Sequence, residues 1–230
     1  MAKPRYAIYL APSPDTPLWR AASRVIGRDA ATGAGLPFPS LPPCDADDWA
    51  EVTAEPRRYG FHATLKAPFE LAEGADEALL VEAARGFAAT RHGFAVPDLA
   101  VRTLKDFVAL TPESRNADLD GLAADCLVAF EPFRAPLTEA ERARRIASLV
   151  DPAHIAAVDR WGYPWVFEAF RFHMTLTGAL PEARRETVRA GLAGFLDDVA
   201  RPLAVDAISV FRQERRDAPF RVLERVPFAV

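Results

Sequence analysis

Two five-residue segments of this chain have nearly the same sequence and carry the residue types best suited to chemistry. Residues 61–65 read Phe-His-Ala-Thr-Leu, and residues 172–176 read Phe-His-Met-Thr-Leu. Each segment therefore supplies one imidazole and, two positions later, one hydroxyl. Imidazole has an unperturbed pKa of about 6.5, so it can accept or donate a proton around neutrality. The two segments together predict an acid–base site.

The spacing of His and Thr predicts that each segment is a strand with one polar and one apolar face. Side chains two positions apart on a strand point to the same side. His62 and Thr64 then share one face, as do His173 and Thr175, and the apolar neighbours point the other way. If the two strands face one another, both imidazoles and both hydroxyls line one cleft.

The same alternation adds further polar side chains to these faces. Lys66 follows the first His-Thr pair, and Arg171 and Thr177 flank the second pair. Phosphodiester cleavage needs one group that removes a proton from the attacking oxygen and another that protonates the leaving oxygen. Hydroxyls and cations stabilise the charge that develops on the phosphoryl oxygens. The polar faces of the two predicted strands therefore predict a phosphate site. Either histidine is suited to act as the base or as the acid.

Two residues outside these strands are further candidates for substrate binding. Tyr163 lies in the aromatic run of residues 161–165, for which core packing and a place at the cleft mouth are both open. Gln213 lies near the end of a late predicted strand. His92 and His154 lie at the ends of predicted helices, so we leave them out of the site. The three arginines Arg142, Arg144 and Arg145 are interpreted as the solvated face of a helix.

The composition excludes several classes of protein. The 230 residues carry a net charge of −4, with a pI of about 5.6, so no overall positive field attracts nucleic acid. No apolar run approaches the roughly 18 residues of a membrane helix, and the N-terminus lacks a secretory signal. We therefore expect a soluble, cytoplasmic protein without membrane contact. Cys44 and Cys126 form no disulfide framework or zinc-ligand pattern, so we expect neither a metal nor another cofactor.

The order of predicted elements indicates an internal duplication. After each His motif the pattern predicts a helix and then two strands, which favours one bilobal domain over residues 1–230, with repeats of about 1–115 and 116–230. The absence of regular β-α-β alternation favours an α+β fold, with two antiparallel sheets facing a central cleft and helices outside. The expected strands cover 5–11, 58–66, 98–104, 106–111, 166–177, 203–213 and 219–229. The expected helices cover 17–27, 79–88, 118–130, 138–149, 152–160 and 181–199, and residues 29–57 are mostly loop.

Longer strings around the motifs resemble one protein family. Residues 59–69 and 170–178, with Tyr6–Tyr9 and residues 133–138 and 161–164, are similar to the 2H phosphoesterase superfamily, named for its two His-x-Thr/Ser motifs. The chain looks most like the branch encoded in bacterial phosphonate-utilisation operons. The resemblance implies metal-independent cleavage of a 2′,3′- or 1,2-type cyclic phosphodiester, or of a 2′,5′ linkage. It also implies that both motif histidines are acid and base and that both threonines hold the phosphate.

These observations lead to one leading hypothesis and two alternatives. The leading hypothesis is a cyclic phosphodiesterase whose partner is a small phosphorylated substrate, namely a sugar or nucleotide cyclic phosphate. The first alternative is an RNA-end cyclic phosphodiesterase or 2′,5′ RNA ligase, against which the acidic pI argues. The second is a non-catalytic protein that binds a phosphorylated metabolite in the same cleft.

Overall fold

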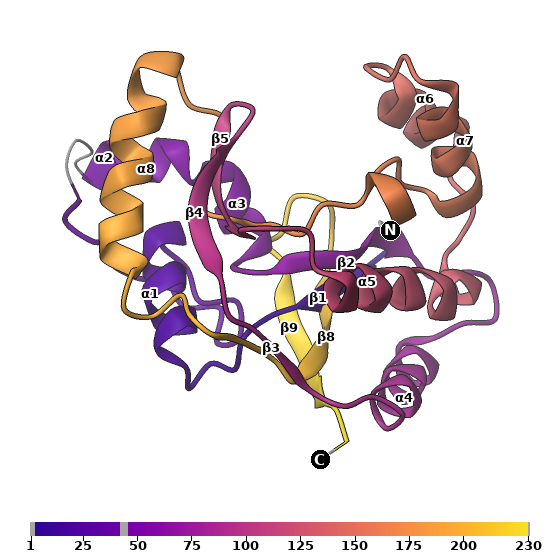
Figure 1. Cartoon of the computed structure of the whole chain (residues 1–230). Helices are drawn as coiled ribbons and strands as arrows, with labels where there is room; N and C mark the ends of the chain where they lie inside the picture. The colour runs from indigo at the N-terminus through magenta and orange to yellow at the C-terminus, as the bar shows by residue number, and fades with distance from the viewer. Residues whose placement is uncertain (1–2, 42–45, 230) are drawn as a thin grey trace.

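The centre of the molecule is an antiparallel sheet (Figure 1). The computed structural model describes residues 3–41 and 46–229, so Cys44 lies outside the described residues. Within them, seven strands pair in the order β4-β5-β6-β2-β1-β8-β9, and β3 and β7 form a separate pair. The strands are β1 Arg5–Leu10, β2 Ala63–Glu70, β3 Phe94–Val96, β4 Leu99–Leu104, β5 Phe107–Pro112, β6 Met174–Thr175, β7 Leu203–Val205, β8 Ala207–Gln213 and β9 Arg221–Pro227.

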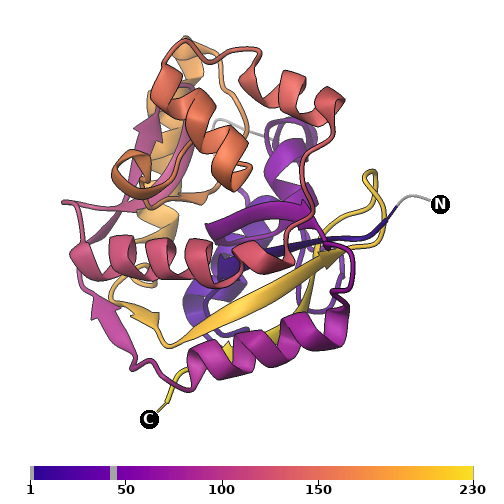
Figure 2. The ribbon, with the colours of Figure 1, turned by 90° about the vertical axis from the view of Figure 1, so that its right-hand side faces the viewer.

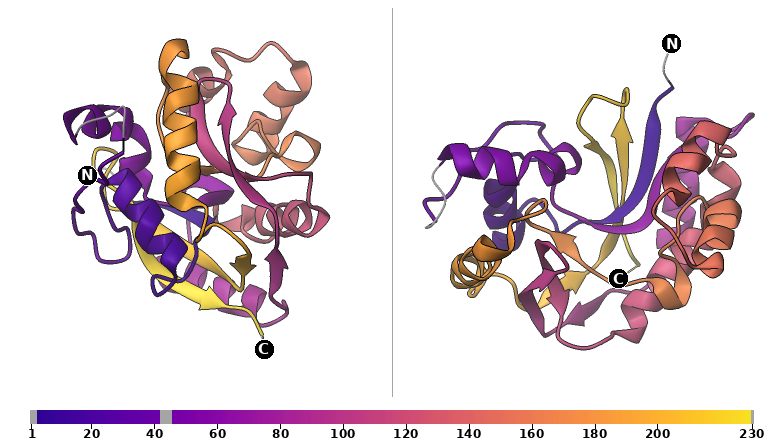
Figure 3. Two further views of the ribbon diagram at one scale, coloured as in Figure 1. Left: turned by 60° about the vertical axis from the view of Figure 1, so that its left-hand side comes forward. Right: turned by 90° about the horizontal axis from the view of Figure 1, so that it is seen from above.

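The helices flank the strands in two groups (Figures 1 and 3). One group contains α1 (Pro17–Ile26), α2 (Ala46–Val52), α3 (Ala54–Tyr59) and α8 (Glu182–Leu196). The other contains α4 (Glu77–Ala88), α5 (Ala117–Ala129), α6 (Glu139–Ile146) and α7 (Pro152–Trp161). Helix α8 packs on β4, α5 on β2, and α4 on β8 and β9. Figure 2 shows α4 and α5 from the side that they cover.

The predicted α+β class is confirmed, since helices surround a sheet whose strand pairs are all antiparallel. The two sheets expected from the sequence are joined into one ladder, because the short strand β6 hydrogen bonds to both β2 and β5. Strands β8 and β9 pair beside β1 and β2, so the strands do not separate into groups at residue 115. The internal duplication stays a prediction.

Capping residues and apolar spacing in the sequence predicted the positions of most helices correctly. Thr16 caps α1 by accepting a hydrogen bond from the Trp19 backbone, and Gly27 ends it with a φ of 80°. Thr138 and Glu141 form the capping box of α6 that the sequence predicts. Cys126 is fully buried on α5, and this burial raises the pKa of its thiol. None of the helices in the described ranges is both long and apolar enough to cross a membrane.

Of the expectations about local structure, one is confirmed and two were wrong. Within the described ranges, residues 29–57 are mostly loop, although α2 and the first four residues of α3 also lie there. Trp49 anchors α2 in the core, and Pro56 is tolerated in the first turn of α3. The first motif strand starts at Ala63 rather than residue 58, because α3 continues to Tyr59. The second motif strand is only β6, since a 3₁₀ turn over Phe167–Ala169 replaces its first part.

Candidate active site

The two His motifs are neighbours in the sheet. Ala63 of β2 pairs with Met174 of β6 in antiparallel register, and both side chains are fully buried. This register sets the His of each motif opposite the Thr of the other. Residues opposite one another in an antiparallel pair have Cβ atoms about 4.5–5.5 Å apart. The four polar side chains therefore start from adjacent positions on one face of the sheet.

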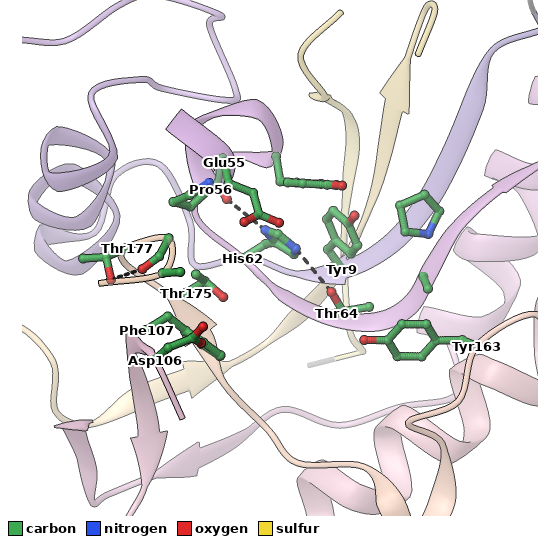
Figure 4. Close-up of a pocket in the computed structure, with 16 residues that line it drawn as sticks. Tyr9, Glu55, Pro56, His62, Thr64, Asp106, Phe107, Tyr163, Thr175 and Thr177 are labelled. Atoms are coloured by element: carbon green, nitrogen blue, oxygen red, sulfur yellow. Dashed lines mark hydrogen bonds between the residues drawn. The ribbon is translucent and has the colours of Figure 1, made fainter. Parts of the chain in front are cut away.

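A cleft of about 390 Å³ opens on this face (Figure 4). His62, the residue just before β2, and Thr64 of β2 line it, and Thr175 lines it from β6. His173 lies beside the cleft, with its ring centroid 5.9 Å from that of Phe107, which is part of the lining. The two imidazoles are also close enough for charge on His173 to lower the pKa of His62.

The His62 ring is fixed by contacts on three sides. Its Nδ1 lies 2.8 Å from the Gly60 carbonyl oxygen, and its Nε2 lies 3.3 Å from the Thr64 hydroxyl. The ring stacks on Tyr9 with centroids 3.8 Å apart. Because a carbonyl oxygen only accepts hydrogen bonds, Nδ1 must carry a proton. Nε2 of the neutral ring is then the acceptor, and it accepts a hydrogen bond from the Thr64 hydroxyl.

His173 is held in the same way as His62. Its Nδ1 lies 2.8 Å from the Arg171 carbonyl oxygen, two residues earlier in the chain. The proton is therefore on Nδ1 in both rings, and Nε2 is the nitrogen available for chemistry. Both rings therefore use Nδ1 for a backbone carbonyl and keep Nε2 for proton transfer.

Burial makes His62 a neutral imidazole. Desolvation lowers its pKa to about 4, and the charge of His173 acts in the same direction against the hydrogen bond to Gly60. His62 should therefore stay neutral, with its proton on Nδ1, as the pH falls from 7 to about 5. Two-dimensional ¹H–¹⁵N NMR of the imidazoles can measure both properties, with His62→Gln to assign the signal. Titration near 6.5, or a proton on Nε2 at pH 7, would contradict this geometry.

Two further predicted residues also line the cleft. Tyr163 faces it across from Thr64 (Figure 4), and burial raises the pKa of its phenol. Thr177 lines it as well, but its side chain is fully buried. The Thr177 hydroxyl donates to the Gly178 carbonyl at 2.9 Å and accepts from the Val108 backbone at 3.0 Å. Its bonds therefore join the end of β6 to β5.

Besides His173, three predicted substrate-binding residues do not line the cleft. The register between β1 and β2 shifts by one residue between Thr64 and Lys66, so the alternation breaks there. Lys66 is buried against α5, and its Nζ lies 2.7 Å from Glu131. The Arg171 guanidinium folds back onto the backbone carbonyls of residues 168 and 170. Gln213 is buried, where it accepts from Arg5 and donates to the Ala218 carbonyl in the turn between β8 and β9.

Sequence reasoning missed several residues of the lining. Tyr9 and Tyr59 contribute aromatic walls, and Phe107 contributes a third from the turn between β4 and β5. Tyr9 belongs to a string that carried the family resemblance, so a signal for it was available. Glu55 lies in the segment predicted as mostly loop and Asp106 at the start of a predicted strand, and neither position carried a signal for the site. In the described part of the chain, no three His, Cys, Asp or Glu side chains form a group that could hold a metal ion.

Comparison with known proteins gives relatives of two kinds. The chain is 40% identical over 230 residues to a "Ribose 1,5-bisphosphate phosphokinase PhnN" of Janthinobacterium sp. (strain Marseille), covering 98% of this chain and 51% of that protein. A protein of the same name from Laribacter hongkongensis is 36% identical over 223 residues, covering 96% of this chain and 51% of that protein. The chain thus spans about half the length of the curated relatives it matches.

The solved structures that resemble the fold are distant in sequence. Escherichia coli LigT complexed with 3′-AMP is 14% identical, with 100% of both chains covered and a TM-score of 0.45. A conserved protein of unknown function from Agrobacterium tumefaciens is 12% identical, with 100% of this chain and 87% of that chain covered and a TM-score of 0.44. A family model described as "Protein of unknown function (DUF1045)" matches residues 64–221, which is more than half of the chain. The chain therefore belongs to the DUF1045 family.

Proposed function

We propose that this protein is a cyclic phosphodiesterase that opens a small cyclic phosphate between His62 and His173. The observation that carries the proposal is the Ala63–Met174 pair, which sets the two His-x-Thr motifs side by side on one face of the sheet. The resemblance of both motifs to 2H phosphoesterases supports the same reading. The cyclic phosphate would lie between the imidazoles, with the hydroxyls of Thr64 and Thr175 donating to its non-bridging oxygens.

The environments of the two histidines favour one division of roles. His62 is neutral, and its Nε2 becomes available as an acceptor when the Thr64 hydroxyl turns to the phosphate, so we assign it as the base that removes a proton from the attacking water. The water oxygen forms a bond to phosphorus, and the bond from phosphorus to one ring oxygen breaks. Protonated His173 gives its Nε2 proton to that leaving oxygen. Transfer of one proton from His62 to His173 through solvent then restores the starting state.

The relatives suggest the class of substrate. Two proteins named ribose 1,5-bisphosphate phosphokinases each contain a segment similar to nearly all of this chain. Opening of a 1,2-cyclic phosphate on ribose 5-phosphate, with cleavage at the 2-oxygen, yields ribose 1,5-bisphosphate. We therefore propose a cyclic ribose phosphate as the substrate, with a role in phosphonate metabolism. The three tyrosines around the cleft form walls suited to a small sugar ring.

A screen of cyclic phosphates tests this proposal. Ribose 1,2-cyclic phosphates and nucleoside 2′,3′-cyclic phosphates would be incubated with the protein in EDTA and followed by ³¹P NMR. We expect ring opening to a phosphomonoester, with EDTA having no effect, because the imidazoles supply the acid and the base. The double variant His62→Ala, His173→Ala controls for contaminating phosphodiesterases. Equal rates for this variant and the wild type, or no opening of any of these compounds, would contradict the proposed function.

A further inference from the structure

A second, smaller pocket of about 50 Å³ adjoins the catalytic cleft. Ala67 and Pro68 of β2 line both spaces. Arg5 of β1 lines the second pocket from the sheet, and Arg145 lines it from α6. Arg145 is therefore not part of the solvated helix face that the sequence suggested, because α6 turns this side chain toward β2. We call this space the Arg5–Arg145 pocket.

Neither guanidinium in this pocket has a carboxylate partner. In the described part of the chain, no carboxylate oxygen lies within 4.0 Å of Arg5 or Arg145. Arg5 donates through Nε, at 2.7 Å, and through Nη2 to the Gln213 side-chain oxygen, and Arg145 donates through Nη2 to the Pro68 carbonyl at 3.3 Å and through Nη1 to the Gly162 carbonyl. These acceptors are neutral. Since a guanidinium has five N–H donors, both groups keep donors and their full positive charge for a ligand.

The two cations are held close together in a partly buried place. Burial lowers the pKa of both guanidiniums, and the charge of Arg5 lowers that of Arg145 further, against the opposing effect of Glu141. Two like charges that repel one another in a desolvated pocket are stabilised by an anion placed between them. The fold therefore maintains a positive site immediately beside the catalytic cleft.

The acidic residues around this pocket are already engaged. Glu70 and Glu141 line it, but both accept from Arg216, at 2.9 Å for Glu70. Arg134 also lines it and is paired with Glu131 at 2.6 Å. Arg5, Arg134, Arg145 and Arg216 together outnumber Glu70, Glu131 and Glu141 by one charge, so this pocket keeps a net positive charge, and Arg5 and Arg145 are its cations without a carboxylate contact.

We propose that the Arg5–Arg145 pocket binds a second phosphate of the substrate whose cyclic phosphate lies between His62 and His173. Arginine is suited to this task because its planar fork of donors matches the oxygens of a phosphate. The inference rests on the proposed function and narrows it, since it selects a small cyclic phosphate that carries a phosphomonoester at its other end. A cyclic phosphate without that group leaves the two guanidiniums unpaired.

Two substrates that differ only in the second phosphate test this inference. Ribose 1,2-cyclic phosphate and its 5-phosphate derivative would be compared by kcat/KM, and we expect a preference for the derivative of roughly 10- to 100-fold. Arg145→Gln should bring the ratio of the two kcat/KM values close to one, and Arg145→Lys should retain part of it. Arg142→Gln is the matched control, because Arg142 lies on the same helix but pairs with Asp159 at the surface. That control should keep the wild-type ratio.

The possible outcomes separate the two proposals. If the wild type opens both substrates at the same rate, the second phosphate site is wrong and the proposed function stands. If the ratio survives in Arg145→Gln and in Arg5→Gln, the preference arises elsewhere and the inference is overturned. If neither compound is opened, the proposed function is contradicted, and this inference is contradicted with it.

Discussion

Replacing either His62 or His173 with alanine should lower kcat for the opening of a cyclic phosphate by about 10²- to 10⁴-fold. Each ring is held by a carbonyl bond on Nδ1, which leaves Nε2 for proton transfer in the proposed reaction. Loss of one ring removes either the base that activates water or the acid that protonates the leaving oxygen. Steady-state and single-turnover kinetics on the substrate found in the screen measure the effect.

The double variant sharpens this prediction. Residues that act as a unit are not additive, so His62→Ala combined with His173→Ala should be little slower than the slower single variant. His92→Ala and His154→Ala are the matched controls, since neither histidine belongs to a His-x-Thr motif. Both should keep wild-type rates. Single variants of His62 and His173 that turn over substrate within about threefold of wild type would rule out the acid–base assignment.

The common face of His and Thr within each motif was predictable, because side chains alternate along a strand in almost any sheet. His and Thr at positions i and i+2 must share a face wherever the backbone is extended. The burial of Ala63 and Met174 confirms the apolar side of both motifs. The sequence did not contain the pairing itself. Register depends on which strands meet, and here a strand of only two residues brings the motifs together.

The placement of Lys66 could not be predicted from the same rule. One shift of register between Thr64 and Lys66 is enough to send its side chain to the opposite side of the sheet. Nothing in the local residues signals this shift. Arg145 is the opposite case, because it was predicted to be solvated and is partly buried. A helix rich in arginine is predicted to be exposed until the elements packed against it are known. Only the packing of α6 beside β2 shows that one of the three arginines is partly buried.

Replacing Glu131 with alanine should lower the free energy of unfolding by about 3–5 kcal/mol. Lys66 is 2% exposed, and the Glu131 carboxylate is the anion that neutralises its ammonium group, at 2.7 Å. Burial lowers the pKa of Lys66, and the hydrogen bond from Lys66 to Glu131 opposes that shift. Without Glu131, the protein must either bury an unpaired charge or release a proton from Lys66. Urea unfolding followed by circular dichroism measures this loss.

A compensating variant separates the charge effect from a simple loss of packing. Lys66→Met removes the buried cation and keeps an unbranched apolar chain. In that background, Glu131→Ala should therefore lower the free energy of unfolding much less than it does in the wild type. The difference between the two costs is the interaction energy of a double-mutant cycle. Glu131 also holds Arg134, and that contribution is common to both backgrounds and cancels. If Glu131→Ala lowers the free energy of unfolding equally in the wild type and in Lys66→Met, the ion pair does not stabilise the fold. Lys66 is then held there by the packing of its side chain alone.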